Sequence, residues 1–231
     1  MGLIRVLSAG APKGGVALTA EAFEAKTGHR FEITFVTAPV IKAAVDGGTA
    51  DADVVVATAP AVAGFEAEGR TMAGVHTVIG SIKAGVVIRV GAQAPDISSA
   101  GTLKRALLEA QSVVRNEASS GLYIARMLET LGIADQVADK TVCLPTGADV
   151  LNHLAQSNIA KEIGFGQLTV IRRLELEGRI RLVGALPKEV ENITTYAAAP
   201  LMGAGDADAA AYVRFLASDE ARKILVSSGV E

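Results

Sequence analysis

Residues 116–121, Asn-Glu-Ala-Ser-Ser-Gly, link an apolar run at 112–115 to an apolar-striped segment that begins near Ser120. This pattern predicts a strand followed by a helix. The first N–H groups of a helix have no partner within it, and the peptide dipoles give that end a partial positive charge. The hydroxyls of Ser119 and Ser120 and the N–H groups around Gly121 could therefore bind an oxyanion. The alternative is that one serine only caps the helix.

Three other predicted strand ends carry small or hydroxyl residues before a helix, at 9–13, 36–39 and 57–60. Short side chains allow a ligand to approach the backbone closely, and ligands of open α/β sheets bind at the carboxyl ends of strands. Ordinary loop chemistry between strand and helix is the alternative. The residues at these junctions that could contact a ligand are Gly10, Ala11, Lys13, Thr37, Ala38 and Thr58.

Strands and helices alternate along the chain, which predicts an α/β fold with largely parallel sheets. The alternation stops twice. From Val75 to Val90 two β-like runs follow each other without room for a helix, and a β-like run at 193–199 follows Pro187. Such breaks indicate that the chain passes from one domain to another. We predict two Rossmann-like lobes joined by two crossing strands, with residues 1–83 and 193–231 in the first lobe, 84–192 in the second, and a ligand-binding cleft between them.

Composition excludes several classes of function. A net charge of −3 without a Lys/Arg run gives no attraction to nucleic acid, and no apolar stretch reaches membrane-spanning length. The chain shows no leader, which predicts a cytoplasmic protein as written, or a periplasmic one if a leader has been removed. The three His and one Cys are scattered, so we expect no metal and no cofactor. Cys143 is expected to be buried in a strand.

The order of elements, together with residues 6–13, 23–28, 51–55 and 119–123, resembles type II periplasmic solute-binding proteins, and most of all the molybdate-binding branch of ABC-transporter receptors. This resemblance covers nearly the whole chain in layout, although its motifs are short. It implies two lobes that close by a hinge on a small anion, gripped by hydroxyls and backbone N–H groups. It also implies an ABC permease as partner if the protein is exported.

The resemblance assigns binding loops to particular positions of this chain. The first loop falls on residues 10–12, the second on Thr37 and Ala38, and the second-lobe contacts on Ser119, Ser120 and residues 146–148. A late contact falls on Gly166 or Gln167. The ligand-binding residues expected in the second lobe are therefore Arg115, Ser119, Ser120, Gly121, Thr146, Gly147 and Gln167.

Two positions depart from the family pattern. Ala11 stands where a binding serine is usual, and the loop at 164–167 lacks the tyrosine often found there. Fewer hydroxyls would face a tetrahedral oxyanion, so an organic carboxylate becomes the expected ligand in place of molybdate. The guanidinium of Arg115 could grip a carboxylate through two hydrogen bonds, and Lys13 could point its ammonium into the cleft. A surface ion pair and a solvated lysine are the respective alternatives.

An enzyme is the second hypothesis, since this scaffold is similar to that of aconitate isomerase, which shifts a double bond by moving a proton. Arg115 and Lys13 would then hold carboxylates, and Lys13, Glu117 or His153 would remove the proton. His153 lies four positions after Asp149 on a predicted helix, where the two could form an acid/base pair or an ordinary surface pair.

Overall fold

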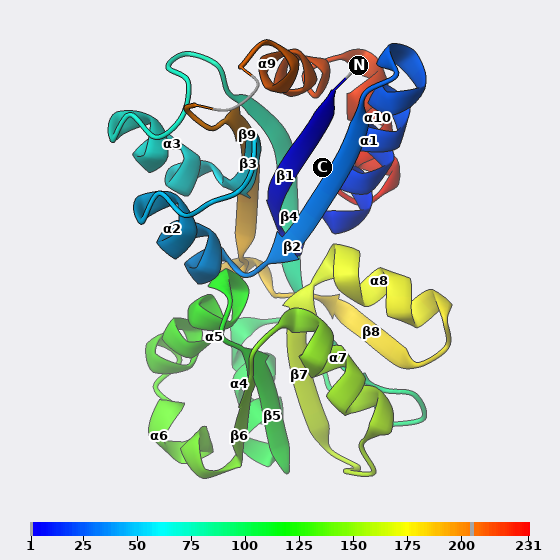
Figure 1. Cartoon of the computed structure of the whole chain (residues 1–231). Helices are drawn as coiled ribbons and strands as arrows, with labels where there is room; N and C mark the ends of the chain where they lie inside the picture. Colours follow the sequence, from blue (N-terminus) through cyan, green and yellow to red (C-terminus); the bar gives the residue numbers. More distant parts are fainter. Residues whose placement is uncertain (1, 204–205) are drawn as a thin grey trace. The chain divides into compact units, whose positions relative to one another are not determined.

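The computed structural model describes residues 2–203 and 206–231, except for the side chains of Arg173 and Asp206. The chain forms two compact units (Figure 1): unit 1 comprises the residues up to Ile82 together with Thr195–Glu231, and unit 2 comprises Lys83–Thr194. The chain passes between them twice, within strand β4 (Thr77–Arg89) and within strand β9 (Ile193–Pro200). The boundaries expected from the sequence, 83/84 and 192/193, differ from the divisions at 82/83 and 194/195 by one and two residues.

The sheet of unit 1 has the strand order β2-β1-β3-β9. Its first three strands are parallel, and β9 runs antiparallel to β3. Figure 1 shows α2 and α3 on one face of this sheet and α1 beside α10 on the other. The elements are β1 (Leu3–Ala9), α1 (Lys13–Thr27), β2 (Arg30–Val36), α2 (Ala38–Asp46), β3 (Val54–Thr58), α3 (Ala59–Ala67), α9 (Asp206–Phe215) and α10 (Asp219–Ser227).

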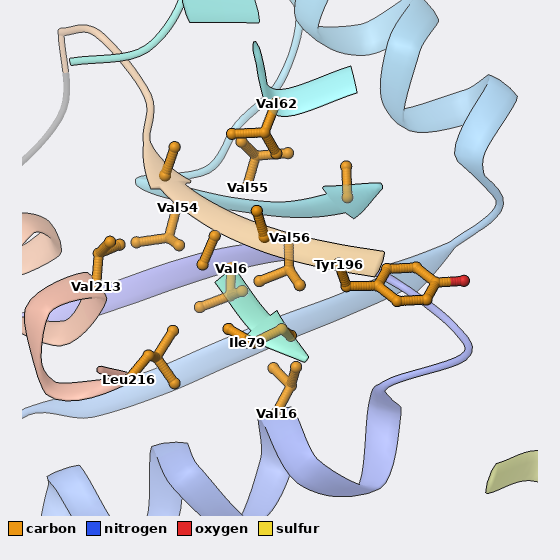
Figure 2. Close-up of a cluster of buried hydrophobic side chains, with 14 of the residues drawn as sticks. Val6, Val16, Val54, Val55, Val56, Val62, Ile79, Tyr196, Val213 and Leu216 are labelled. Atoms are coloured by element: carbon orange, nitrogen blue, oxygen red, sulfur yellow. The ribbon is translucent and has the colours of Figure 1, made fainter. Parts of the chain in front are cut away.

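The core of unit 1 is built mainly from valine and alanine. The side chains of Val54, Val55 and Val56 in β3 are fully buried, because helices cover both faces of the sheet and every side chain of a central strand must pack. Figure 2 shows these valines among apolar side chains from β1, α1 and α9. Tyr196 lies within β9, and its hydroxyl points away from the valines.

The sheet of unit 2 has the order β6-β5-β7-β4-β8, in which β6, β5 and β7 are parallel and β4 is antiparallel to both its neighbours. One apolar cluster packs α4, α5 and α6 on one face, and another packs α7 and α8 on the other (Figure 1). The elements are α4 (Ala100–Glu109), β5 (Ser112–Asn116), α5 (Ser119–Thr130), α6 (Ala134–Val137), η1 (Ala138–Lys140), β6 (Thr141–Leu144), α7 (Gly147–Gln156), β7 (Glu162–Gln167), α8 (Leu168–Leu176), β8 (Ile180–Ala185) and η2 (Lys188–Val190).

The predicted α/β class is confirmed, and two local expectations are wrong. Cys143 is exposed and not buried, because β6 is an edge strand that pairs only with β5. The two β-like runs around residues 76–79 and 85–88 form one continuous strand, β4. In the part of the chain that the structure describes, no helix is both long and apolar enough to cross a membrane.

Candidate functional site

Three helices of unit 2 begin at one edge of its sheet. Since β5, β6 and β7 are parallel and adjacent, their carboxyl ends lie at a shared edge, where α5, α7 and α8 start. These starts contain most of the second-lobe residues expected from the sequence. The fold therefore brings the turn at 116–121, the cap at Thr146 and the end of β7 at Gln167 to the same edge of unit 2.

Asn116 organises the turn between β5 and α5. Its side chain is buried, and its Oδ1 accepts hydrogen bonds from the N–H of Ala118 at 2.8 Å and of Gly121 at 3.2 Å. Its Nδ2 donates to Ser120 Oγ at 3.3 Å. A Cβ on Gly121 would lie 1.7 Å from the carbonyl oxygen of Asn116. Only glycine therefore lets the helix start so close to the strand end.

The start of α5 has two backbone donors without acceptors in the described part of the chain. The N–H groups of Ser119 and Ser120 have no hydrogen-bond acceptor among the described residues, and no acidic side chain lies in the first turn of α5. Ser119 is half-buried and Ser120 is buried. The first turn of this helix thus offers no carboxylate to offset the positive end of the helix dipole, which favours the binding of an anion.

The neighbouring start of α7 is closed by its own side chains. Thr146 Oγ1 accepts from the N–H of Asp149 at 3.2 Å and donates to Asp149 Oδ2 at 2.7 Å, and that carboxylate also accepts from the N–H of Thr146 at 3.0 Å. The Thr146 hydroxyl is therefore used within the cap. Gly147 lies close to the turn, since a Cβ there would be 3.7 Å from Asn116 Nδ2.

The remaining expected residues of unit 2 lie around this edge with different partners. Arg115 donates from its NH1 to the carbonyl oxygen of Asn116 at 3.3 Å, and Glu117 is exposed. Gln167 is buried; its Nε2 donates to Thr194 Oγ1 at 3.4 Å, and its Oε1 has no partner among the described residues. A buried amide with an unused polar atom at a site edge is a candidate ligand contact.

The helices α1, α2 and α3 of unit 1 begin at the carboxyl ends of the parallel strands β1, β2 and β3. None of the three has an acidic residue in its first turn or a side-chain hydrogen bond at its cap. Gly10, Ala11, Thr37, Ala38 and Thr58 all lie at these junctions. Lys13, the first residue of α1, places its ammonium 5.0 Å from the centroid of the Phe35 ring. Like α5, these three helices therefore begin without an acid in the first turn and without a side-chain hydrogen bond at the cap.

Comparison with protein families identifies the chain. A model of the family described as bacterial extracellular solute-binding protein matches residues 4–231. The chain belongs to this family. The resemblance predicted from the sequence is therefore confirmed.

Relatives of this solute-binding protein include an enzyme. The aconitate isomerase of a Pseudomonas species is 29% identical over 239 residues, which cover 99% of this chain and 87% of that protein. Among solved structures, the periplasmic molybdate-binding protein of Azotobacter vinelandii has a TM-score of 0.81 at 17% identity and covers 99% of this chain and 98% of its own. The sulfate-binding protein of Mycobacterium tuberculosis has a TM-score of 0.75 at 16% identity, covering 99% and 86%. The two structures establish the fold alone.

His153, a candidate base, lies away from the other candidate residues. The pair that it was expected to form with Asp149 is wrong. His153 Nε2 is 3.1 Å from Glu162 Oε1, at the amino end of β7 and thus at the opposite edge of the sheet from the turn at 116–121. It does not pair with Asp149, because that carboxylate is held by the α7 cap. Sequence spacing placed the two residues on one helix face but could not reveal these competing partners.

Two residues were not among the expected ligand contacts. Asn116 is polar, ends a buried strand and precedes a Ser-Ser-Gly segment, a signal that the sequence did contain. Tyr196 pairs in register with Thr58, where β3 gives way to α3, and its residue surface is only 2% exposed. It brings a hydroxyl to the edge of unit 1 where α3 begins. The loop expected at 164–167 is instead the end of strand β7 in unit 2, and it lacks a tyrosine.

Proposed function

We propose that this solute-binding protein binds a small anion, either an oxyanion or an organic carboxylate. The observation that carries the proposal is the start of α5. There two backbone N–H groups lack acceptors in the described part of the chain, the first turn holds no acid, and the hydroxyls of Ser119 and Ser120 belong to the same turn. Such a site needs donors in fixed positions, and it needs neither a metal nor a poised base.

The nature of the anion follows from what the loops lack. The two proteins of the same fold described above are a molybdate-binding and a sulfate-binding protein, and both of these anions are tetrahedral oxyanions. In this chain Ala11 offers no hydroxyl in the first loop, and residues 164–167, at the end of β7, include no tyrosine. Arg115 adds a planar guanidinium close to the turn, which suits a carboxylate. We therefore favour an organic carboxylate as the ligand.

The partner proposed for this function is an ABC permease that receives the anion. The family description places its members outside the cell, so the proposal puts the protein in the periplasm or its equivalent. Release to a permease requires that the ligand be held reversibly, without a covalent bond. Backbone N–H groups and hydroxyls satisfy that requirement.

A ligand screen tests the proposal. The thermal unfolding midpoint of the purified protein is measured with molybdate, sulfate, phosphate, citrate and both aconitates, at ionic strength matched with sodium chloride, and with a sugar and an amine as uncharged and cationic probes. A ligand at a hundred times its Kd stabilises the folded state by about 2.7 kcal/mol, which raises the midpoint by several degrees. A midpoint raised by the sugar or the amine, and by none of the anions, contradicts the proposal.

Replacing Arg115 by alanine separates the two classes of anion. If the ligand is a carboxylate bound by the guanidinium, calorimetric titration will show a loss of about 2 kcal/mol in binding free energy. Affinity for a tetrahedral oxyanion held by N–H groups will change little. Arg126→Ala, at an exposed position of α5, is the matched control for loss of a positive charge. Equal losses in the two variants would reduce Arg115 to a general electrostatic contribution.

Isomerisation of a small polycarboxylate is the second candidate, and the aconitate isomerase relative is the observation in its favour. A base would take a proton from the methylene carbon next to the double bond, and the proton would return at the far alkene carbon. Lys13 and Glu117 are the candidate bases, since both are exposed at helix starts. Incubation with cis- or trans-aconitate, followed by NMR in D₂O, tests the reaction. Interconversion abolished in Lys13→Met or Glu117→Gln but retained in Lys26→Met would establish it.

A further inference from the structure

The side chain of Asn116 fixes which atoms the start of α5 can offer to a ligand. Backbone N–H groups can only donate, so the oxygen of the Asn116 amide must be the atom that faces Ala118 and Gly121. Its nitrogen must then face Ser120 Oγ. The orientation of this amide is thus settled by its partners and not by an arbitrary choice between oxygen and nitrogen.

This orientation dictates the direction of the Ser120 hydroxyl. Because Ser120 Oγ accepts from the amide nitrogen, its own proton must be donated elsewhere, and no acceptor for that proton exists among the described residues. The hydroxyl belongs to a residue that is only 5% exposed, where an unused donor is costly. An anion at the start of α5 would supply the missing acceptor.

The same side chain selects the backbone donors. Asn116 Oδ1 uses the N–H groups of Ala118 and Gly121, so the N–H groups of Ser119 and Ser120 are the ones that remain. Gly147, at the start of α7, also lies against the amide, since a Cβ there would be 3.7 Å from Nδ2. One buried side chain therefore holds the start of α5 and lies against that of α7.

We propose that Asn116 is the positioning residue of the anion site: it holds the turn at 116–121 so that Ser119 N–H, Ser120 N–H and the Ser120 hydroxyl all donate to the ligand. The inference rests on the proposed function of anion binding. Asn116 itself makes no contact with the ligand in this scheme. It acts through Ser120 and through the turn.

Asn116→Asp tests the scheme because it preserves the turn and reverses the hydroxyl. One carboxylate oxygen still accepts from Ala118 and Gly121, so the thermal midpoint should not fall. The other oxygen can only accept, so it takes the proton of Ser120 away from the ligand. With the anion identified in the screen, we expect the Kd to rise about tenfold or more near neutral pH, and the loss to diminish as acidification protonates the introduced carboxyl.

A double-mutant cycle separates the hydroxyl from simple charge repulsion. Ser120→Ala should raise the Kd about tenfold in the wild-type background and by less than about twofold in the Asn116→Asp background, where the hydroxyl no longer serves the ligand. Asn152→Asp, in the second half of α7, controls for one added charge in unit 2. Equal tenfold losses from Ser120→Ala in both backgrounds, or an unchanged Kd in Asn116→Asp, would overturn the inference.

Amide exchange in the absence of any ligand distinguishes failure of this inference from failure of the proposed function. By NMR, the N–H groups of Ala118 and Gly121 should be protected in the wild type and in Asn116→Asp, and should exchange about tenfold faster in Asn116→Ala. A protein that binds no anion but shows this pattern retains the positioning role of Asn116 and loses the proposed ligand. Equal exchange in all three proteins refutes the positioning role whatever the ligand is.

Discussion

The starts of α5 and α7 lie at the same edge of one sheet, yet the protein treats them in opposite ways. At α7, Thr146 and Asp149 form a reciprocal cap and a carboxylate offsets the helix dipole. At α5, the cap residue is Ala118, the first turn has no acid, and two N–H groups have no acceptor among the residues that the structure describes. A reciprocal cap stabilises a helix start without a ligand, so the difference supports the proposal that an anion binds at the start of α5 and not at that of α7.

The largest expected effect concerns the glycines of these two starts. In Gly121→Ala the new Cβ would lie 1.7 Å from the Asn116 carbonyl oxygen, so the helix must move away from the strand. We expect a loss of about 3 kcal/mol or more in the free energy of unfolding, measured by urea denaturation.

Gly147→Ala is the matched control, because its Cβ would be 3.7 Å from Asn116 Nδ2, an ordinary van der Waals distance. Its unfolding free energy should change by less than about 1 kcal/mol. Comparable losses in the two variants would show that α5 does not sit closer to its strand than α7 does.

Much of the secondary structure could be predicted from the sequence. Alternation of apolar runs and turns predicted the α/β class, and it predicted a strand at 112–115 and a helix from near Ser120, which are observed as β5 (Ser112–Asn116) and α5 (Ser119–Thr130). These elements follow from local periodicity. The short α6 was not predicted, because four residues carry too little periodicity to be detected.

The site was less predictable, since hydrogen-bond partners depend on which segments meet. The sequence pointed to the segment 116–121 but named Ser119, Ser120 and Gly121 as its contacts, and it gave no role to Asn116, whose partners arise only once β5 and α5 meet. Thr146, like the two serines, is a hydroxyl residue at a helix start, so the sequence alone predicted the same role for it. Only the distances to Asp149 reveal that its hydroxyl is already used.

The next largest effect is expected from a substitution that makes the start of α5 resemble that of α7. Ser119→Asp places a carboxylate in the first turn, where it would occupy the positive end of the helix in place of the ligand. Affinity for the anion should fall by about 2 kcal/mol, while the free energy of unfolding stays the same or rises by up to about 1 kcal/mol. Calorimetric titration and urea denaturation measure the two quantities.

Ala148→Asp is the control for the added charge, because it introduces a carboxylate at a helix start that already contains Asp149. We expect its effect on the Kd to be less than about threefold. If both variants weakened binding to the same extent, the anion would be responding to the charge of the whole edge and not to the open start of α5.

The smallest effect is expected at Thr146, and it tests whether α7 takes part in binding at all. Thr146→Ala removes the hydroxyl that accepts from the N–H of Asp149 and donates to its carboxylate, so it should cost about 1 kcal/mol of unfolding free energy. Because that hydroxyl is committed to the cap, the Kd for the anion should remain within about twofold of the wild type. Thr146→Ser, which keeps the hydroxyl, should restore most of the stability. If Thr146→Ala lost affinity while Thr146→Ser kept it, the cap would have to open when the ligand binds. The Thr146 hydroxyl would then leave the Asp149 carboxylate and donate to the anion.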